Sequence, residues 1–212
     1  MELAVSILGI KENLKEKIDE LNKTKTSFLH IDIMDGKFVP NIHDNFVELE
    51  KSLKDNKKRV DVHLMVEDVE RYVNIYKNIH PEYITFHYEI SDSIHRIINI
   101  IKGNNIKVGL AIKPNTKVEE IYEFLSYIHT CLIMTVEPGK GGQKLIESTV
   151  EKVRELKKYI TEKNIEIDIE VDGGINLRTA PEVKDAGANI LVSGSAILMA
   201  NNFKTIIDEL KK

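Results

Sequence analysis

Histidine and aspartate side chains stand near the ends of three segments that otherwise resemble apolar strands. Successive side chains of a strand point to opposite faces, so His30 and Asp32 share one face, and His63 and Asp172 take matching places in the other two segments. A single histidine there is most simply a hydrogen-bonded core residue, but two imidazoles and two carboxylates together favour a metal site. Such a set without cysteine suits Zn²⁺, Fe²⁺, Mn²⁺ or Co²⁺. The sequence therefore predicts an enzyme with one divalent ion per chain, and Zn²⁺ is the first candidate.

Glycine-bearing loops follow the last three predicted strands. Glycine lets backbone amides approach an anion closely, and a helix N-terminus adds partial positive charge. Ordinary turn chemistry would explain any one of these loops. Three in succession, with helices starting behind them, favour a phosphate-bearing ligand instead. The residues expected to hold it are Gly139, Lys140, Gly141, Gly142, Asp172, Gly173, Gly174, Gly194 and Ser195.

Three methionines, Met34, Met65 and Met134, lie near the same strand ends. Packing alone would account for them, but polarizable thioethers would also form an apolar floor beneath a planar intermediate. His87 ends another strand and is placed for a supporting role in the site wall, or for a core position. The remaining histidines look like loop or surface residues without a role, and they are His43, His80, His95 and His129.

The elements that would position these residues alternate along the whole chain. Apolar segments of strand length are followed by helical patterns with apolar residues three and four apart, which one buried helix face requires. Such β-then-α units predict an all-parallel sheet, and closure into a barrel leaves no edge strand. We expect one domain, residues 1–212, folded as a single (β/α)8 TIM barrel with its site at the C-terminal ends of the strands. An open doubly wound sheet is the alternative, but no Gly-x-Gly-x-x-Gly follows the first strand. The expected strands are 3–8, 28–34, 60–66, 83–87, 107–112, 131–136, 166–172 and 190–193.

Composition excludes some partners. The formal net charge is −4, so no basic surface for nucleic acid is expected. No apolar run approaches the ~20 residues of a membrane span, and the first residues lack the basic leader of a signal peptide. The single cysteine, Cys131, cannot pair within the chain and fits a buried, inert thiol in a reducing cytoplasm. We expect a cytoplasmic homo-oligomer that binds a small molecule.

Several segments together resemble the ribulose-phosphate 3-epimerase family, and the resemblance covers nearly the whole chain. Each segment alone is short, but the combination is specific. The segments are HIDIMDGKFVPN at 30–41, DVHLMV at 61–66, ITFH at 84–87, MTVEPG at 134–139, GGQ at 141–143, VDGGI at 171–175 and VSGSA at 192–196.

The resemblance implies inversion at C3 of a ketose phosphate, D-ribulose 5-phosphate to D-xylulose 5-phosphate, as in the pentose phosphate pathway. It implies that His30, Asp32, His63 and Asp172 ligate the metal. Asp32 and Asp172 would also be the acid–base pair that moves the C3 proton through an enediolate. The implied substrate contacts are Ser6, His63, residues 139–142, residues 172–174, Gly194 and Ser195.

The sequence departs from the family pattern in three places. Residues 9–11 read Gly-Ile-Lys where the family usually has Ser-Ala-Asp. The segment 41–61 looks short, which predicts a trimmed second helix. Lys140 replaces an aromatic residue of the loop after the sixth predicted strand. Its ammonium either points to solvent or attracts the substrate phosphate.

Two other functions remain open. A 3-epimerase of a hexulose 6-phosphate, such as D-allulose 6-phosphate, would use the same chemistry, and one hydroxymethyl unit is worth only ~1–3 kcal/mol of discrimination. Residues 173–174 and 193–195 look more like the five-carbon enzyme. A non-catalytic sugar-phosphate binder would have no need of both Asp32 and Asp172.

Overall fold

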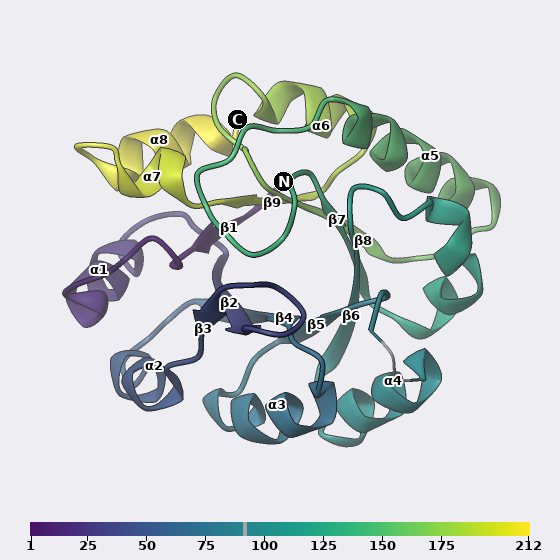
Figure 1. The fold of residues 1–212 in the computed structure, drawn as a ribbon. Coiled ribbons are helices and arrows are strands. Elements are labelled where there is room, and N and C mark those ends of the chain that lie inside the picture. Colours follow the sequence, from purple (N-terminus) through teal and green to yellow (C-terminus); the bar gives the residue numbers. More distant parts are fainter. Residues whose placement is uncertain (91–92) are drawn as a thin grey trace.

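The computed structural model describes residues 1–90 and 93–212, and in these ranges eight parallel strands close into a barrel surrounded by helices (Figure 1). Going around the barrel, the order is β1-β9-β8-β7-β6-β5-β4-β2, and pairing of β1 with β2 completes the circle. The strands are β1 (Glu2–Ser6), β2 (Phe28–Asp35), β4 (Arg59–Met65), β5 (Tyr83–His87), β6 (Lys107–Ile112), β7 (Thr130–Met134), β8 (Asp168–Asp172) and β9 (Ile190–Ser193). The predicted (β/α)8 barrel is confirmed.

Helices form the outer ring of the molecule (Figure 1). The α-helices are α1 (Leu14–Leu21), α2 (Phe46–Ser52), α3 (Val69–Tyr76), α4 (Ile94–Gly103), α5 (Ser148–Glu162), α6 (Ala180–Ala186), α7 (Ser195–Leu198) and α8 (Phe203–Leu210). Two 3₁₀ segments, η1 (Lys77–Ile79) and η2 (Val118–Tyr127), complete the connections. The second helix, α2, is only 7 residues long, as the short segment before β4 predicted. Within the described ranges, no helix has the length and apolar character that crossing a bilayer requires.

Alternation along each strand separates the two faces of the barrel wall. On β2, Ile31 and Ile33 are fully buried in the large core between strands and helices. The intervening His30 and Asp32 are also buried, yet they belong to the barrel interior. The apolar residues of β2 point outward and pack against the helices. Because side chains alternate along a strand, the polar residues next to them point into the barrel.

A short antiparallel strand was not predicted. β3 (Ile42–His43) pairs with the end of β2, with His43 opposite Met34. Two residues cannot show an alternating pattern, so this strand has no sequence signal of its own. It turns the chain after β2 back across the strand end and so shapes one side of the barrel opening.

Candidate active site

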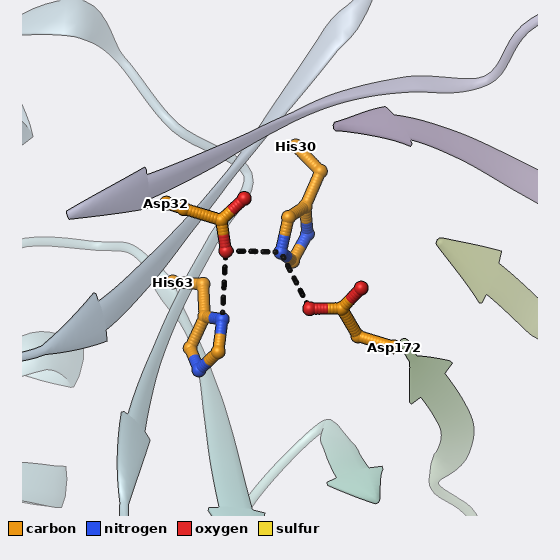
Figure 2. Close-up of side chains that lie close together, drawn as sticks. All are labelled: His30, Asp32, His63 and Asp172. Carbon is orange, nitrogen blue, oxygen red and sulfur yellow. Dashed lines mark hydrogen bonds and ion pairs between the residues drawn. The ribbon is translucent and has the colours of Figure 1, made fainter. Parts of the chain in front are cut away.

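Four side chains from three strands converge inside the C-terminal end of the barrel. Figure 2 shows His30 and Asp32 of β2, His63 of β4 and Asp172 of β8 turned toward one another. Asp32 Oδ1 lies 3.2 Å from His63 Nδ1 and 3.4 Å from His30 Nε2. Asp172 Oδ2 lies 3.9 Å from the same His30 nitrogen. Pairing of β2 with β4 places Asp32 beside His63, which is why sequence parity brings these groups together.

One ring nitrogen of His30 has a hydrogen-bond partner and the other has none among the described residues. Its Nδ1 lies 2.6 Å from Asp61 Oδ2, so Nδ1 carries the proton and the carboxylate accepts it. Nε2 of His30, fully buried, has no hydrogen-bond partner among the described residues. A buried nitrogen without a hydrogen-bond partner costs free energy, whereas a cation bound beside it would offset that cost. Its orientation toward two carboxylates therefore indicates a cation site.

The two carboxylates of the cluster have opposite tendencies to bind a proton. Burial alone would raise the pKa of Asp32, but the positive charge that His30 carries in the metal-free chain, together with the nearby imidazole of His63, holds it well below its ordinary range. Burial, and then the negative charge of Asp32, raise the pKa of Asp172 to about 6. Burial lowers the pKa of His30, yet the charges of Asp32 and Asp61 outweigh burial and raise it well above its ordinary value. In the metal-free chain a proton therefore occupies Nε2, the atom at which a bound cation would replace it. One carboxylate is thus ionised beside another that readily takes a proton.

The donor set fits a divalent ion. One ligand atom each from His30, Asp32, His63 and Asp172 can be chosen so that all four lie within 4.8 Å of one another. Two imidazole nitrogens and two carboxylate oxygens suit Zn²⁺ and other transition ions of similar preference. The Asp61 carboxylate behind His30 is the type of partner that commonly orients a metal-binding imidazole.

A cavity of about 410 Å³ opens in front of the cluster at the strand ends. Asp32 and Asp172 lie in its wall, and Met34, Met65 and Met134 also line it, while their predicted role beneath a planar intermediate remains a prediction. Ser6 also lines the cavity and donates a hydrogen bond to Asp32 Oδ2 at 2.8 Å. The predicted loop residues that line it are Gly139, Lys140, Gly141, Gly142, Gly173, Gly174, Gly194 and Ser195.

His63 lies behind this wall rather than in it. Its side chain is fully buried, and it is not among the residues that line the described cavity. His63 is therefore placed for the cation cluster, while its predicted contact with substrate remains a prediction. His87 is also fully buried, as a core position requires, and it contacts His63, as a supporting role requires, so its role remains a prediction. Burial lowers the pKa of His87 to about 4.

The helices behind the three glycine loops begin at different distances from them along the chain. Only α7 begins within its loop, at Ser195, whereas α5 and α6 begin at Ser148 and Ala180, beyond theirs. After Gly174 the chain first makes a turn in which Asn176 Oδ1 accepts from the backbone amide of Arg178. A helix thus follows each of the three loops, and only the N-terminus of α7 lies within its loop.

The glycine loops themselves pack closely around the cavity. Gly173 and Gly174 have φ angles of +122° and +68°, which side chains with a Cβ rarely adopt. A Cβ on Gly174 would lie 2.3 Å from the amide nitrogen of Leu145. Asn41 Nδ2 donates to the carbonyl of Gly139 at 2.7 Å and ties this loop to the one after β2.

Three residues of the site were missed or misjudged from the sequence. Asp61 and Glu170 are buried in the barrel interior, and Glu170 Oε1 lies 3.6 Å from His30 Nδ1. Both share the inward parity of His63 and Asp172 on strands already identified, so the strand pattern itself places them inside the barrel. His43 was expected to be a loop or surface residue, and it is half-buried with its Nδ1 2.7 Å from the carbonyl of Asp32. The unpredicted strand β3 brings it there.

A family model and the sequences of curated relatives point to the same protein family. The family model described as "Ribulose-phosphate 3 epimerase family" matches residues 2–198. A ribulose-phosphate 3-epimerase of Methanocaldococcus jannaschii is 40% identical over 213 residues, covering 100% of this chain and 90% of that protein. The Bacillus subtilis protein of the same name is 38% identical and is covered to 98%. A solved 3-hexulose-6-phosphate synthase from Salmonella typhimurium covers 99% of this chain and 96% of its own with a TM-score of 0.69, and its 14% identity supports the fold alone.

Proposed function

The chain belongs to the ribulose-phosphate 3-epimerase family, and we propose that Asp32 and Asp172 exchange the C3 proton of D-ribulose 5-phosphate to give D-xylulose 5-phosphate. The observation that carries the proposal is the convergence of two carboxylates of the cavity wall on Nε2 of the buried His30, which has no hydrogen-bond partner among the described residues. A sugar-phosphate binder without chemistry would have no use for an ionised carboxylate beside one that readily holds a proton.

Inversion at C3 requires proton removal on one face of the sugar and proton delivery on the other. The C3 proton is acidic because the neighbouring C2 carbonyl delocalises the charge as an enediolate. Asp32 and Asp172 come from β2 and β8, which β1 and β9 separate in the barrel, so the two carboxylates can flank a substrate. One must begin ionised and the other protonated, and the low pKa of Asp32 and the raised pKa of Asp172 support that arrangement.

Each carboxylate has one oxygen available for this exchange. Asp32 Oδ1 and Asp172 Oδ2 face His30, whereas Asp32 Oδ2 meets the Ser6 hydroxyl at the cavity. The Ser6 hydroxyl can therefore hold Asp32 Oδ2 in place at the cavity, and this oxygen is the one that would exchange a proton with the substrate. The two carboxylates titrate as a pair, so a proton belongs to the pair rather than to one residue.

His30, Asp32, His63 and Asp172 would hold one divalent ion, with Zn²⁺ as the first candidate and Fe²⁺, Mn²⁺ or Co²⁺ as the others. Bound there, such an ion would stabilise the negative charge that develops at C2 and C3 and lower the pKa of both carboxylates. Asp61 orients His30 for this role through the hydrogen bond at Nδ1.

The glycine loops would hold the phosphate and exclude water. The loops after β7, β8 and β9 meet at the cavity, and α7 begins at Ser195 in the last of them. Their backbone amides can approach an anion closely. The loop after β7 also contacts the loop after β2 through Asn41 and Gly139, so it can cover the sugar and limit loss of the enediolate.

A direct comparison of substrates tests the proposed reaction. We expect protein loaded with a divalent ion to convert ribulose 5-phosphate with kcat/KM at least about 10-fold above that for allulose 6-phosphate. Thorough chelation should remove the activity, and one equivalent of ion should restore it. A preference for the hexulose phosphate would overturn the substrate assignment, whereas full activity without metal would overturn the metal's role alone.

A further inference from the structure

A chain of three side chains runs from the barrel rim to the candidate metal cluster. Nε2 of His63 lies 2.9 Å from Nε2 of His87. Nδ1 of His87 lies 3.1 Å from Oε2 of Glu89. The two imidazoles come from adjacent strands, β4 and β5, and their ring centroids are 5.0 Å apart.

The carboxylate at the outer end fixes which nitrogen carries each proton. Glu89 only accepts hydrogen bonds when ionised, so Nδ1 of His87 must be the donor. A neutral His87 then has a bare Nε2, which can only accept. His63 must therefore donate from its Nε2, and this leaves Nδ1 of His63 bare. That bare nitrogen faces Asp32 Oδ1 at 3.2 Å, within the metal cluster.

The opposite tautomer of His87 would place a nitrogen lone pair against the Glu89 carboxylate. A proton on Nε2 of His87 would leave its Nδ1 lone pair 3.1 Å from the Glu89 carboxylate. Two lone pairs facing each other at this distance in a buried site repel. In the first arrangement a lone pair also faces a carboxylate, that of Asp32 at 3.2 Å from His63 Nδ1, but there a metal ion bound between the two atoms turns the contact into ligation. The metal site therefore favours the arrangement in which His63 presents a lone pair to the cluster.

Other contacts keep Glu89 in place. Its Oε1 accepts from the backbone amide of Lys113 at 2.7 Å and from the hydroxyl of Thr116. Both donors belong to the segment that follows β6. The ring of Phe38 packs against His87 with centroids 4.7 Å apart. Backbone, hydroxyl and aromatic contacts therefore preorganise the outer end of the chain.

We propose that Glu89 and His87 are positioning residues that hold His63 in its metal-binding tautomer. The inference rests on the metal site of the proposed function and adds two residues to it. His30 is held in the same way by a carboxylate in direct contact, Asp61. For His63 a second imidazole separates the carboxylate from the ligand, so the orienting charge lies at the rim instead of inside the barrel.

Zinc affinity, measured by competition with a chelator, tests this relay of Glu89, His87 and His63. Glu89→Gln keeps the shape but removes the charge that requires a donor at Nδ1 of His87. We expect its zinc dissociation constant to rise about 10-fold, and that of His87→Phe, which keeps a ring but has no acceptor, to rise up to about 100-fold. Glu119→Gln removes a carboxylate charge from an exposed position on η2 and should leave the constant unchanged.

The tautomer itself can be observed without any variant. In zinc-loaded protein with ¹⁵N-labelled histidine, ring nitrogen shifts should show His87 protonated on Nδ1 and bare on Nε2. A proton on Nε2 of His87, or equal zinc affinity for Glu89→Gln and Glu119→Gln, would overturn the relay alone. An unsubstituted chain that binds no zinc would overturn the metal site and the relay with it.

Discussion

The carboxylates of Asp32 and Asp172 face the same atom, Nε2 of His30, at 3.4 and 3.9 Å. They reach it from strands that are not neighbours in the barrel. This shared contact couples their titration, since a charge on one opposes a charge on the other. It also means that any cation placed at the nitrogen neutralises both carboxylates at once.

Replacing either carboxylate should stop epimerisation without unfolding the barrel. For Asp32→Asn and for Asp172→Asn we expect kcat to fall by at least about 10²–10⁴-fold, because an amide cannot exchange the proton. Both side chains lie in the barrel interior among polar groups, so their isosteric amides should fit. Steady-state kinetics with circular dichroism as the folding control will decide. Near-normal kcat in either variant, with metal bound, would contradict the two-carboxylate account.

Asp172 should lower the stability of the metal-free chain above acidic pH. Its pKa is raised from 3.8 to about 6 in the fold, so the native state favours the protonated form. Its stabilising contribution is complete below pH 4 and is lost as the pH rises through about 6. Asp172→Asn should therefore match the unsubstituted chain at pH 4 and be more stable by about 1–3 kcal/mol at pH 8. Urea unfolding of chelated protein measures this, and equal stabilities at pH 8 would refute the raised pKa.

Much of this site could be predicted from the sequence because strand parity is a local property. The alternation around His30 and Asp32 fixed their shared face, and eight repeated units indicated a closed barrel that brings strand ends together. The contacts of His43 could not be predicted, since they depend on a two-residue strand without a pattern. The pairing of Glu89 with His87 depends on a loop conformation, which residue types alone do not specify.

Lys140 should influence substrate capture through its charge. It lines the cavity in the loop after β7, and the backbone carbonyl of the same residue accepts from Gln143 Nε2 at 2.9 Å. We expect Lys140→Met to raise KM, and to do so more at low ionic strength, because exposed charges are screened over about 10 Å at 0.1 M salt. Lys144→Met, in the same loop but outside the cavity lining, is the matched control. An unchanged KM at both salt concentrations would leave Lys140 as a solvent-facing residue.

Gly174 should tolerate no side chain. Its φ of +68° and the 2.3 Å approach of a Cβ to the Leu145 amide would force the loops after β7 and β8 apart. We expect Gly174→Ala to destabilise the fold by about 1–3 kcal/mol and to raise KM. Gly103→Ala, at the end of α4 where a Cβ meets no atom within 4 Å, is the control. Thermal unfolding and KM measured together test this, and equal behaviour of the two variants would contradict close packing of the loops.

Hydrogen exchange during turnover tests the central claim most directly. Ribulose 5-phosphate is incubated with metal-loaded protein in D₂O, and C3 of the xylulose 5-phosphate formed is examined by proton NMR. If one carboxylate removes the proton and the other delivers one on the opposite face, the first product molecules should carry deuterium at C3. Product that retains the substrate's own C3 hydrogen from the earliest times would contradict the roles assigned to Asp32 and Asp172.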